Sequence, residues 1–287
     1  MCRLYGLHAN EPTRVECSLV RAQNALMEQS RKDQEGFTNA HGWGLAAQSE
    51  GAPFVEKQAW AAYHGEHFKK AAARVYSKTV IAHVRRATVG PPAIENTHPF
   101  VHGFWLFAHN GTVPNFDRVR ERLIDELDPL HRNEIHGSTD SEHVFRYLMT
   151  LWEHEPERPL RETLRIGLEQ VIKWCREIDP NRRISLNVLW TDGEHMVGSR
   201  LNRTLWYLER DGLTLCEICG QSHVHHGPKQ HYRAVEIASE PITREDWLQI
   251  PNGTVFSVDP DFRLNIVPLG AEAIVAADGA KTIEARL

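Results

Sequence analysis

The sequence predicts an α+β fold in which mainly antiparallel sheets are covered by helices. Short apolar or alternating runs typical of strands recur in blocks along the chain. Between these blocks, apolar residues recur at the three- and four-residue spacing of amphipathic helices. Two Asp-Gly pairs, Asp192-Gly193 and Asp211-Gly212, are typical of the tight turns that join antiparallel strands.

The first part of the chain is expected to open with strands at 3–8 and 43–48. A helix should lie between them, because apolar residues recur there after Pro12-Thr13: Val15, Leu19, Ala22 and Leu26. The polar segment 30–39 is expected to be a loop. The apolar run 79–84 and the segment that starts at Phe104 are further expected strands.

The second part should contain three helices followed by strands. One helix is marked by Val119, Leu123 and Leu127, and another opens at 137–142. The third carries apolar residues from Leu160 to Cys175 and ends at Asp179-Pro180. Strands are expected at 184–190, 204–208, 232–238 and 254–258. The only candidate seam, 153–159, is better explained as a connection between two helices, so residues 1–287 are predicted to form one domain.

Composition excludes several partner classes. The chain has 287 residues, 41% hydrophobic and 25% charged, with a formal net charge of −5, so it has no basic surface for nucleic acid. No apolar stretch is long enough to span a membrane, and no signal peptide precedes Cys2. Five cysteines, an odd number, suit a reducing compartment. We therefore expect a cytoplasmic protein.

The second residue is the first candidate for chemistry. Removal of Met1 would leave Cys2 with a thiol and a free α-amino group. A thiolate is a strong nucleophile, and an α-amino group with a pKa of roughly 7.7–8 can accept the thiol proton. Nucleophile and base would then come from one residue. The alternative is that cysteine occupies position 2 by chance.

Three later segments contain groups that an acyl-transferring cysteine needs. Asn110-Gly111 can supply an amide and a backbone N–H to an oxyanion. Arg85 can bind a substrate carboxylate through two parallel hydrogen bonds, and Asp140 can bind a substrate ammonium. Each also has a structural explanation. Asn-Gly is a common hairpin turn, Arg85 could lie on the surface, and residues 139–142 read as a helix N-cap.

Taken together, these motifs resemble the class II glutamine amidotransferases of the N-terminal-nucleophile hydrolase superfamily. The resemblance spans most of residues 1–150, with core motifs between 2 and 142. A weaker resemblance at 238–253 is to small stand-alone members, which include the ergothioneine-pathway γ-glutamyl hydrolase and a fungal glutathione-degrading amidotransferase. The matching core segments are Met1-Cys2-Arg3-Leu4-Tyr5-Gly6, His41-Gly42-Trp43-Gly44, His83-Val84-Arg85 through Thr88, Asn96-Thr97-His98-Pro99-Phe100, His109-Asn110-Gly111 and Gly137 through Glu142.

The resemblance implies a four-layer αββα sandwich and a role for each matching residue. Cys2 matches the nucleophile, and Asn110 and Gly111 match the oxyanion hole. Arg85 and Asp140 match the residues that hold the α-carboxylate and α-ammonium of the glutamyl group. Thr88 and His98 match positions that support the glutamine pocket. Two positions depart from the sugar- and purine-synthesising members, which carry Trp and His where this chain has Arg86 and Val89.

The resemblance therefore implies an N-terminal cysteine amidohydrolase that needs no cofactor. Its substrate would be glutamine or a γ-glutamyl conjugate, cleaved through a Cys2 thioester to glutamate and ammonia or an amine. A partner subunit that accepts ammonia or forms a peptidase complex is compatible with this function. The alternative is a catalytically idle subunit that senses glutamine or scaffolds a larger complex, with no need for the nucleophile or the oxyanion donors.

A second candidate site contains cysteine and histidine. Cys216 and Cys219 have the Cys-x-x-Cys spacing of zinc ligands, and His223, His225 and His226 follow. The alternative is a strand with buried thiols followed by a histidine-rich loop, since the sequence shows no second ligand pair at a suitable spacing. The residues leave this choice open. His83 and His109, inside the family motifs, are expected to be core histidines with satisfied hydrogen bonds.

Overall fold

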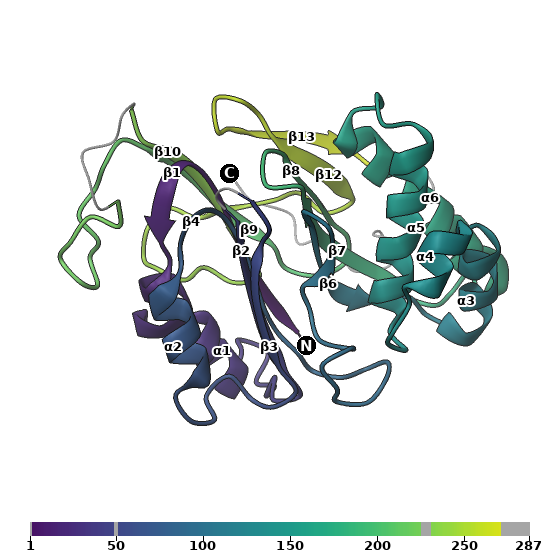
Figure 1. Cartoon of the computed structure of the whole chain (residues 1–287), viewed down its shortest axis with the longest axis horizontal. Helices are drawn as coiled ribbons and strands as arrows, with labels where there is room; N and C mark the ends of the chain where they lie inside the picture. Colours follow the sequence, from purple (N-terminus) through teal and green to yellow (C-terminus); the bar gives the residue numbers. More distant parts are fainter. Residues whose placement is uncertain (1, 49–50, 225–230, 271–287) are drawn as a thin grey trace.

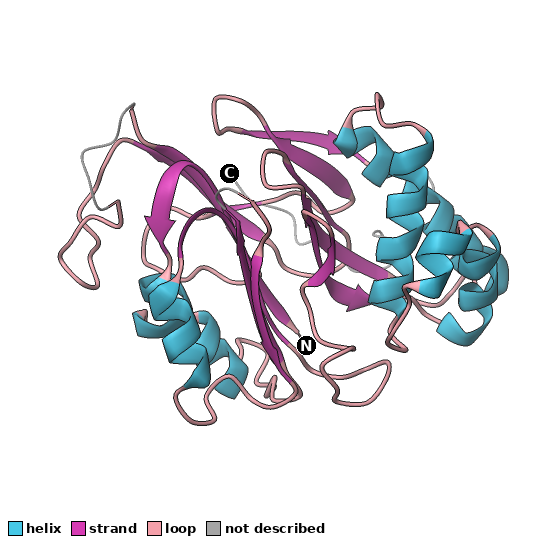
Figure 2. Ribbon diagram, viewed as in Figure 1, coloured by secondary structure: helices cyan, strands magenta, loops and turns pink. Residues whose placement is uncertain are grey.

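Two antiparallel sheets stacked face to face form the centre of the molecule, and helices cover both outer faces (Figures 1 and 2). The computed structural model describes residues 2–48, 51–224 and 231–270. The first sheet has the strand order β11 (Leu248–Gln249), β9 (Trp206–Asp211), β10 (Arg233–Ala238), β1 (Arg3–Arg14), β4 (Tyr76–Val84), β2 (Trp43–Gln48) and β3 (Phe54–Gln58).

The second sheet packs against the inner face of the first. Its strand order is β13 (Leu264–Pro268), β12 (Thr254–Val258), β8 (Met196–Arg200), β7 (Ser185–Thr191), β6 (Trp105–Thr112) and β5 (Phe100–His102). The expected four-layer αββα sandwich is therefore confirmed.

Helices from different parts of the chain cover the two sheets (Figure 1). The outer face of the first sheet is covered by the short π-helical segment η1 (Cys17–Arg21), α1 (Leu26–Arg31) and α2 (His67–Arg74). The outer face of the second sheet lies beside α3 (Phe116–Asp125), α4 (Pro129–Asn133), α5 (Asp140–His154) and α6 (Leu160–Ile178). None of the described helices is long and apolar enough to cross a membrane.

Three hydrophobic cores follow from the alternation of side chains along the strands. Tyr5 and Leu7 of β1 pack in the outer core with α1 and α2, whereas Leu4 of the same strand packs in the middle core between the sheets. In the second sheet, Phe107 of β6 packs toward α5, and Leu106 and Ala108 face the middle core. This alternation determines which strand residues face the interior between the two sheets.

Several sequence predictions agree with the structure. Strands β2 and β12 have the expected bounds, and the seam at 153–159 does join two helices, α5 and α6. Asp192-Gly193 lies in the connection between β7 and β8, whose register pairs Thr191 with Met196. Gly193 has a φ of 98°, a conformation that glycine adopts without the steric cost of a Cβ.

Other local predictions were wrong. The single helix expected between 15 and 26 is instead η1 followed by a separate α1, and α1 extends to Arg31, inside the expected loop. Strand β1 continues to Arg14 rather than ending at residue 8. Asp211-Gly212 does not form a two-residue turn. Strands β9 and β10 pair as expected, but they are separated in sequence by residues 212–232, so the connection is much longer than a tight turn.

Candidate active site

Cys2 lies at the start of β1, beside the end of β4. The register pairs Arg3 with Val84, so one further step places Cys2 opposite Arg85. The Arg86 backbone N–H points at Cys2 Sγ across 3.2 Å, and the thiol lies 3.3 Å from the Arg86 carbonyl oxygen. Burial raises the pKa of the Cys2 thiol, although the Arg86 N–H and the Arg85 charge act against this. The thiol therefore needs a base to become a nucleophile at neutral pH.

A buried ion-pair cluster holds the strand that carries Cys2. The guanidinium of Arg3 pairs with Asp33 at 3.1 Å and with Glu240 at 2.6 Å, and all three side chains are almost fully buried. Arg3 Nη1 also donates to the Cys2 carbonyl oxygen at 3.1 Å. Removing one partner from a buried ion pair typically costs about 3–5 kcal/mol. This cluster therefore fixes the backbone next to the thiol.

Asn110 lies inside strand β6, which runs from Trp105 to Thr112, so it is not part of a hairpin turn. It is two residues beyond Ala108 and so points, like Ala108, into the space between the sheets. Its Nδ2 donates to Ser239 Oγ at 3.2 Å. The same hydroxyl oxygen accepts the Leu4 N–H at 3.0 Å, and Ser239 N–H donates to the Leu4 carbonyl. Ser239 thus links Asn110 to the strand that carries Cys2.

Gly111 occupies a position where no side chain fits. A Cβ there would lie 2.0 Å from the Ser185 carbonyl oxygen and 2.3 Å from His109 Nε2. His109 itself is buried and satisfied, with Nε2 3.0 Å from the Ser185 carbonyl and Nδ1 2.9 Å from Ser141 Oγ. Because the carbonyl can only accept, Nε2 carries the proton and Nδ1 accepts from the hydroxyl. His109 is the core histidine that the sequence predicted.

Asp140 is the first residue of α5, directly after the N-cap. Thr139 Oγ1 accepts the Glu142 N–H at 3.3 Å, so the N-cap interpretation of 139–142 is also correct. The Asp140 carboxylate accepts the Val113 N–H at 2.8 Å and the Ser141 N–H at 2.9 Å. Its charge acts on the pKa of both Cys2 and Arg85. The carboxylate is therefore within electrostatic range of the thiol and the guanidinium.

Arg85 is buried and not a surface arginine. Its guanidinium holds the following loop: Nη1 donates to the Pro91 carbonyl at 2.8 Å, and Nη2 donates to Val89 at 2.8 Å and Gly90 at 3.1 Å. In this conformation the fork is therefore engaged by backbone carbonyls. A substrate carboxylate that binds the fork has to replace some of these contacts.

Thr88 and His98 lie in different surroundings. Thr88 is exposed on the loop that Arg85 holds. His98 is buried, and its ring centroid lies 4.3 Å from that of His83 and 4.7 Å from that of Phe100. Burial lowers the pKa of both histidines, to about 3 for His83. His98 therefore packs as a neutral ring in the interior, beside His83 and Phe100.

Sequence reasoning assigned no role to Ser239, Glu240 or Asn96, although their segments were recognised as similar to the family. Asn96 joins two loops of the site: its Oδ1 accepts the Ser138 N–H at 2.8 Å and its Nδ2 donates to the Pro91 carbonyl at 3.0 Å. Only the Ala238-Ser239-Glu240-Pro241 resemblance signalled that a segment so distant in sequence would reach the site.

Comparisons with known proteins agree with this geometry. The family model described as class II glutamine amidotransferases matches residues 1–265. The chain is 28% identical over 295 residues to the probable glutamine amidotransferase DUG3 of Saccharomyces cerevisiae, covering 90% of this chain and 82% of the relative. It is 26% identical over 215 residues to the γ-glutamyl-hercynylcysteine sulfoxide hydrolase of Mycobacterium tuberculosis, covering 74% and 82%.

Solved structures share the fold. A glutamine aminotransferase class-II domain protein from Silicibacter pomeroyi superposes with a TM-score of 0.63 at 17% identity, covering 93% of this chain and 99% of that one. The glutamine phosphoribosylpyrophosphate amidotransferase of B. subtilis gives 0.60 at 16% identity, with 94% of this chain matching 50% of that larger enzyme. With the family model matching nearly its whole length, this chain belongs to the class II glutamine amidotransferases.

Proposed function

We propose that the protein cleaves the γ-glutamyl amide bond of glutamine or a γ-glutamyl conjugate through a thioester on Cys2. One observation carries the proposal. The β1–β4 register places Cys2 opposite Arg85, the charge of Asp140 acts on both, and Asn110 is hydrogen-bonded through Ser239 to the strand that follows Cys2. An acyl-transfer site needs a nucleophile, an oxyanion donor and groups that orient the substrate.

The first half-reaction forms the thioester. With Met1 removed, the α-amino group of Cys2 accepts the thiol proton, directly or through one water. The thiolate attacks the δ-carbonyl carbon, and negative charge develops on the carbonyl oxygen. The second hydrogen of Asn110 Nδ2 and the N–H of Gly111 stabilise that charge. The C–N bond then breaks, and the leaving amine takes the proton from the α-ammonium.

The second half-reaction releases glutamate. The α-amino group takes a proton from a water molecule, whose oxygen attacks the thioester carbonyl. The tetrahedral intermediate uses the same oxyanion donors and then expels the Cys2 thiolate, which recovers the proton. Met1 lies outside the described residues, so its removal is part of this proposal. No step in this sequence requires a metal or an organic cofactor.

Arg85 and Asp140 position the glutamyl group in this proposal. The Arg85 guanidinium binds the α-carboxylate after exchanging contacts with the carbonyls of 89–91, and Asp140 binds the α-ammonium. Thr88 and His98 support the pocket, Thr88 from the loop that Arg85 holds and His98 from the buried interior. With the α-carboxylate and α-ammonium of the substrate held in place, the length of the substrate side chain determines whether its scissile carbonyl reaches Cys2.

The relatives point to two substrate classes. One is named as a probable glutamine amidotransferase and another as a γ-glutamyl-hercynylcysteine sulfoxide hydrolase, so both glutamine and a γ-glutamyl conjugate suit a chain of this family. We infer that residues 1–287 act as one catalytic domain. An ammonia-accepting or peptidase partner would add to this activity without changing the chemistry at Cys2.

The test measures glutamate release by the Met1-processed protein. Glutamine, asparagine and γ-glutamyl peptides are supplied to wild type, Cys2→Ala and, as a matched cysteine control, Cys175→Ala. We expect glutamate from γ-glutamyl substrates with wild type and Cys175→Ala, none with Cys2→Ala, and a thioester mass adduct trapped by acid quenching. Substrate binding without glutamate release or acylation would overturn the proposal in favour of an idle glutamine-sensing or scaffolding subunit.

A further inference from the structure

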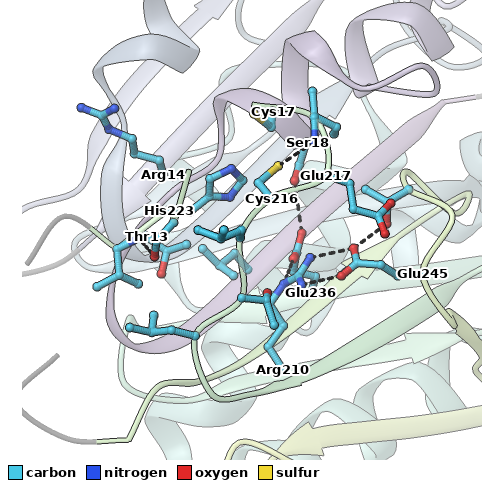
Figure 3. A pocket seen from close by; sticks show the side chains of 18 of the residues that line it. Thr13, Arg14, Cys17, Ser18, Arg210, Cys216, Glu217, His223, Glu236 and Glu245 are labelled. Atoms are coloured by element: carbon cyan, nitrogen blue, oxygen red, sulfur yellow. Dashed lines mark hydrogen bonds and ion pairs between the residues drawn. The ribbon is translucent and has the colours of Figure 1, made fainter. Parts of the chain in front are cut away.

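A group of metal-ligand side chains comes together far from Cys2. Cys17, Cys216, Cys219 and His223 each direct one ligand atom into a space where all four atoms lie within 4.8 Å of one another. Cys17 is the first residue of η1, and the other three lie in the loop that follows β9, whose described part is 212–224. In Figure 3, Cys17 of η1 lies near Cys216 and His223 of this loop.

Cys17 is the fourth ligand, and the sequence alone did not identify it. From sequence, Cys216 and Cys219 lacked a partner pair, because Cys17 is almost two hundred positions away. In the structure, β1 runs from Arg3 to Arg14, and η1 follows it beside the loop. The Arg14 N–H donates to the His223 carbonyl at 2.9 Å. His225 and His226, the other histidines noted in this segment, lie outside the described residues.

The spacing of the four atoms fits one tetrahedral ion. With metal–sulfur and metal–nitrogen bonds of about 2.3 and 2.0 Å, neighbouring ligand atoms in a zinc tetrahedron lie roughly 3.5–3.8 Å apart. Cys219 Sγ and His223 Nε2 are separated by 3.7 Å. All four ligand atoms lie within 4.8 Å of one another, so small side-chain rotations are enough to bring them to that range.

The backbone around Cys216 and Cys219 already has the conformation of a ligand turn. The Ile218 N–H points at Cys216 Sγ across 3.4 Å, which stabilises a thiolate. The Gly220 N–H donates to the Cys216 carbonyl at 2.8 Å, and the Cys216 N–H donates to Gln221 at 3.0 Å. Gly220 has a φ of 69°, which closes the turn without a Cβ penalty.

The nearest buried charges do not serve as counter-ions for three thiolates. Arg210, on β9 beneath the loop, pairs with Glu236 at 2.5 Å and with Glu245 at 2.8 Å (Figure 3). Its charge is thus balanced by carboxylates. A divalent cation is the group that lets three cysteines ionise side by side, and three sulfurs with one imidazole nitrogen suit Zn²⁺ in particular.

We propose that Cys17, Cys216, Cys219 and His223 bind a structural zinc ion that links residues 216–223 to η1. Four protein ligands complete the tetrahedron and leave no open position for a substrate, so the ion stabilises the fold. Strand β1, with 12 residues, spans on the order of 40 Å between this cluster and Cys2. The metal is therefore separate from the proposed hydrolysis.

The first test measures zinc in the full-length protein, produced and purified under reducing conditions. Elemental analysis by mass spectrometry should find about one zinc per chain in wild type. The double variant Cys216→Ser/Cys219→Ser should retain less than a tenth of that. His102→Ala is the matched control, because His102, His131 and Glu134 form the other group of three metal-type ligands among the described residues. It should keep the full zinc content.

The second test needs no variant and so does not depend on whether the double variant folds. Wild type is stripped with a chelator and titrated with CoCl₂, and a tetrahedral thiolate site should give intense visible d–d absorption with one-to-one stoichiometry. ZnCl₂ should abolish that absorption, and limited proteolysis within 212–232 should slow at least tenfold when zinc is restored. Absence of metal in wild type, octahedral cobalt, or a Cys216–Cys219 disulfide in the reduced preparation would overturn the proposal.

Discussion

At the residue scale, the position of the proposed oxyanion donor depends on a hydroxyl group from a distant segment. Ser239 Oγ accepts from both Asn110 Nδ2 and Leu4 N–H, so it couples strand β6 to the strand that begins beside Cys2. An amide nitrogen carries two hydrogens. The contact with Ser239 uses one and orients the other, which is the hydrogen that the proposed mechanism needs.

Asn110→Ala should lower kcat by about 10²–10³-fold and change KM little. Loss of one oxyanion donor has that magnitude because the contact matures only in the transition state. Steady-state kinetics normalised to the fraction of chains that form the thioester provides the measurement. If the side chain serves only to hold Ser239, thermal stability will fall while turnover per folded chain stays near the wild-type value.

Ser239→Ala should reduce both stability and turnover. The buried Leu4 N–H loses its acceptor, which costs about 1–3 kcal/mol, and the Asn110 amide loses its orientation. Ser199→Ala is the control, because that buried hydroxyl donates to the Leu186 carbonyl in the second sheet, at 2.7 Å. We expect similar losses in urea midpoint for the two variants and a lower kcat for Ser239→Ala alone. Equal kcat values would exclude the positioning role.

Arg85→Lys should impair hydrolysis although it keeps the charge. A lysine has no planar fork, so it can neither hold the carbonyls of Val89, Gly90 and Pro91 together nor bind a carboxylate in a bidentate way. kcat/KM for glutamine and a γ-glutamyl anilide should fall by at least tenfold, and asparagine should remain a poor substrate. An Arg85→Lys enzyme with wild-type kcat/KM would show that the fork does not read the glutamyl head group.

At the scale of elements, what could be predicted from sequence depended on whether the signal was local. Strand β2 follows from a short apolar run, and helix α6 follows from helical periodicity and an Asp-Pro stop, so both could be predicted. The break between η1 and α1 was not, because the same apolar spacing suits one continuous helix. Asn110-Gly111 was ambiguous for the opposite reason, since the pairing of these two residues with β7 overrides the turn preference of the dipeptide.

The candidate site shows the same division. Cys2, Arg85, Asn110 and Asp140 could be proposed from sequence because each lies in a recognisable motif. The fork of Arg85, in contrast, is engaged by its own loop, which no spacing in the sequence reveals. Ser239, Asp33 and Glu240 reach the site only through the pairing of β1 with β10 and the burial of Arg3. Contacts of this kind depend on the packed fold and not on local sequence.

Gly111→Ala should destabilise the second sheet. The new Cβ would lie 2.0 Å from the Ser185 carbonyl oxygen, a backbone atom, so β6 and β7 have to separate. Overpacking of this kind costs about 1–3 kcal/mol or more. Gly270→Ala is the control, because its Cβ would meet only the flexible end of Glu169, at 3.1 Å. Urea unfolding should show a loss for Gly111→Ala alone. Equal midpoints would mean that the strands accommodate the methyl group.

At the scale of the whole molecule, neutral histidines are built into the packed layers. Burial is the main cause that lowers the pKa of His8 to about 4 and that of His83 to about 3, and it also lowers the pKa of His98. In the unfolded chain a histidine titrates near a pKa of about 6.5. Below that pH the unfolded state binds protons that the folded state does not, so the unfolded state is favoured by acid.

We therefore predict that stability is greatest above about pH 6.5 and falls as the pH drops, by about 1.4 kcal/mol per pH unit for each such histidine. The loss due to His8 should continue to about pH 4, where the folded protein also takes up that proton, and the loss due to His83 to about pH 3. Urea midpoints between pH 7.5 and 5 isolate this effect, because most carboxylates stay ionised across that range.

A matched pair of variants tests whether buried histidine side chains cause the pH dependence of the free energy of unfolding. His8→Asn keeps a polar group near Thr79, whose hydroxyl lies 3.0 Å from His8 Nδ1, and removes one buried titrating ring. It should make the pH dependence shallower by about 1.4 kcal/mol per pH unit. His64→Asn alters an exposed histidine and should leave the slope unchanged. A wild-type midpoint that is flat from pH 7.5 to 5 would contradict the prediction, because it would require the folded sheets to accept protons as readily as the unfolded chain.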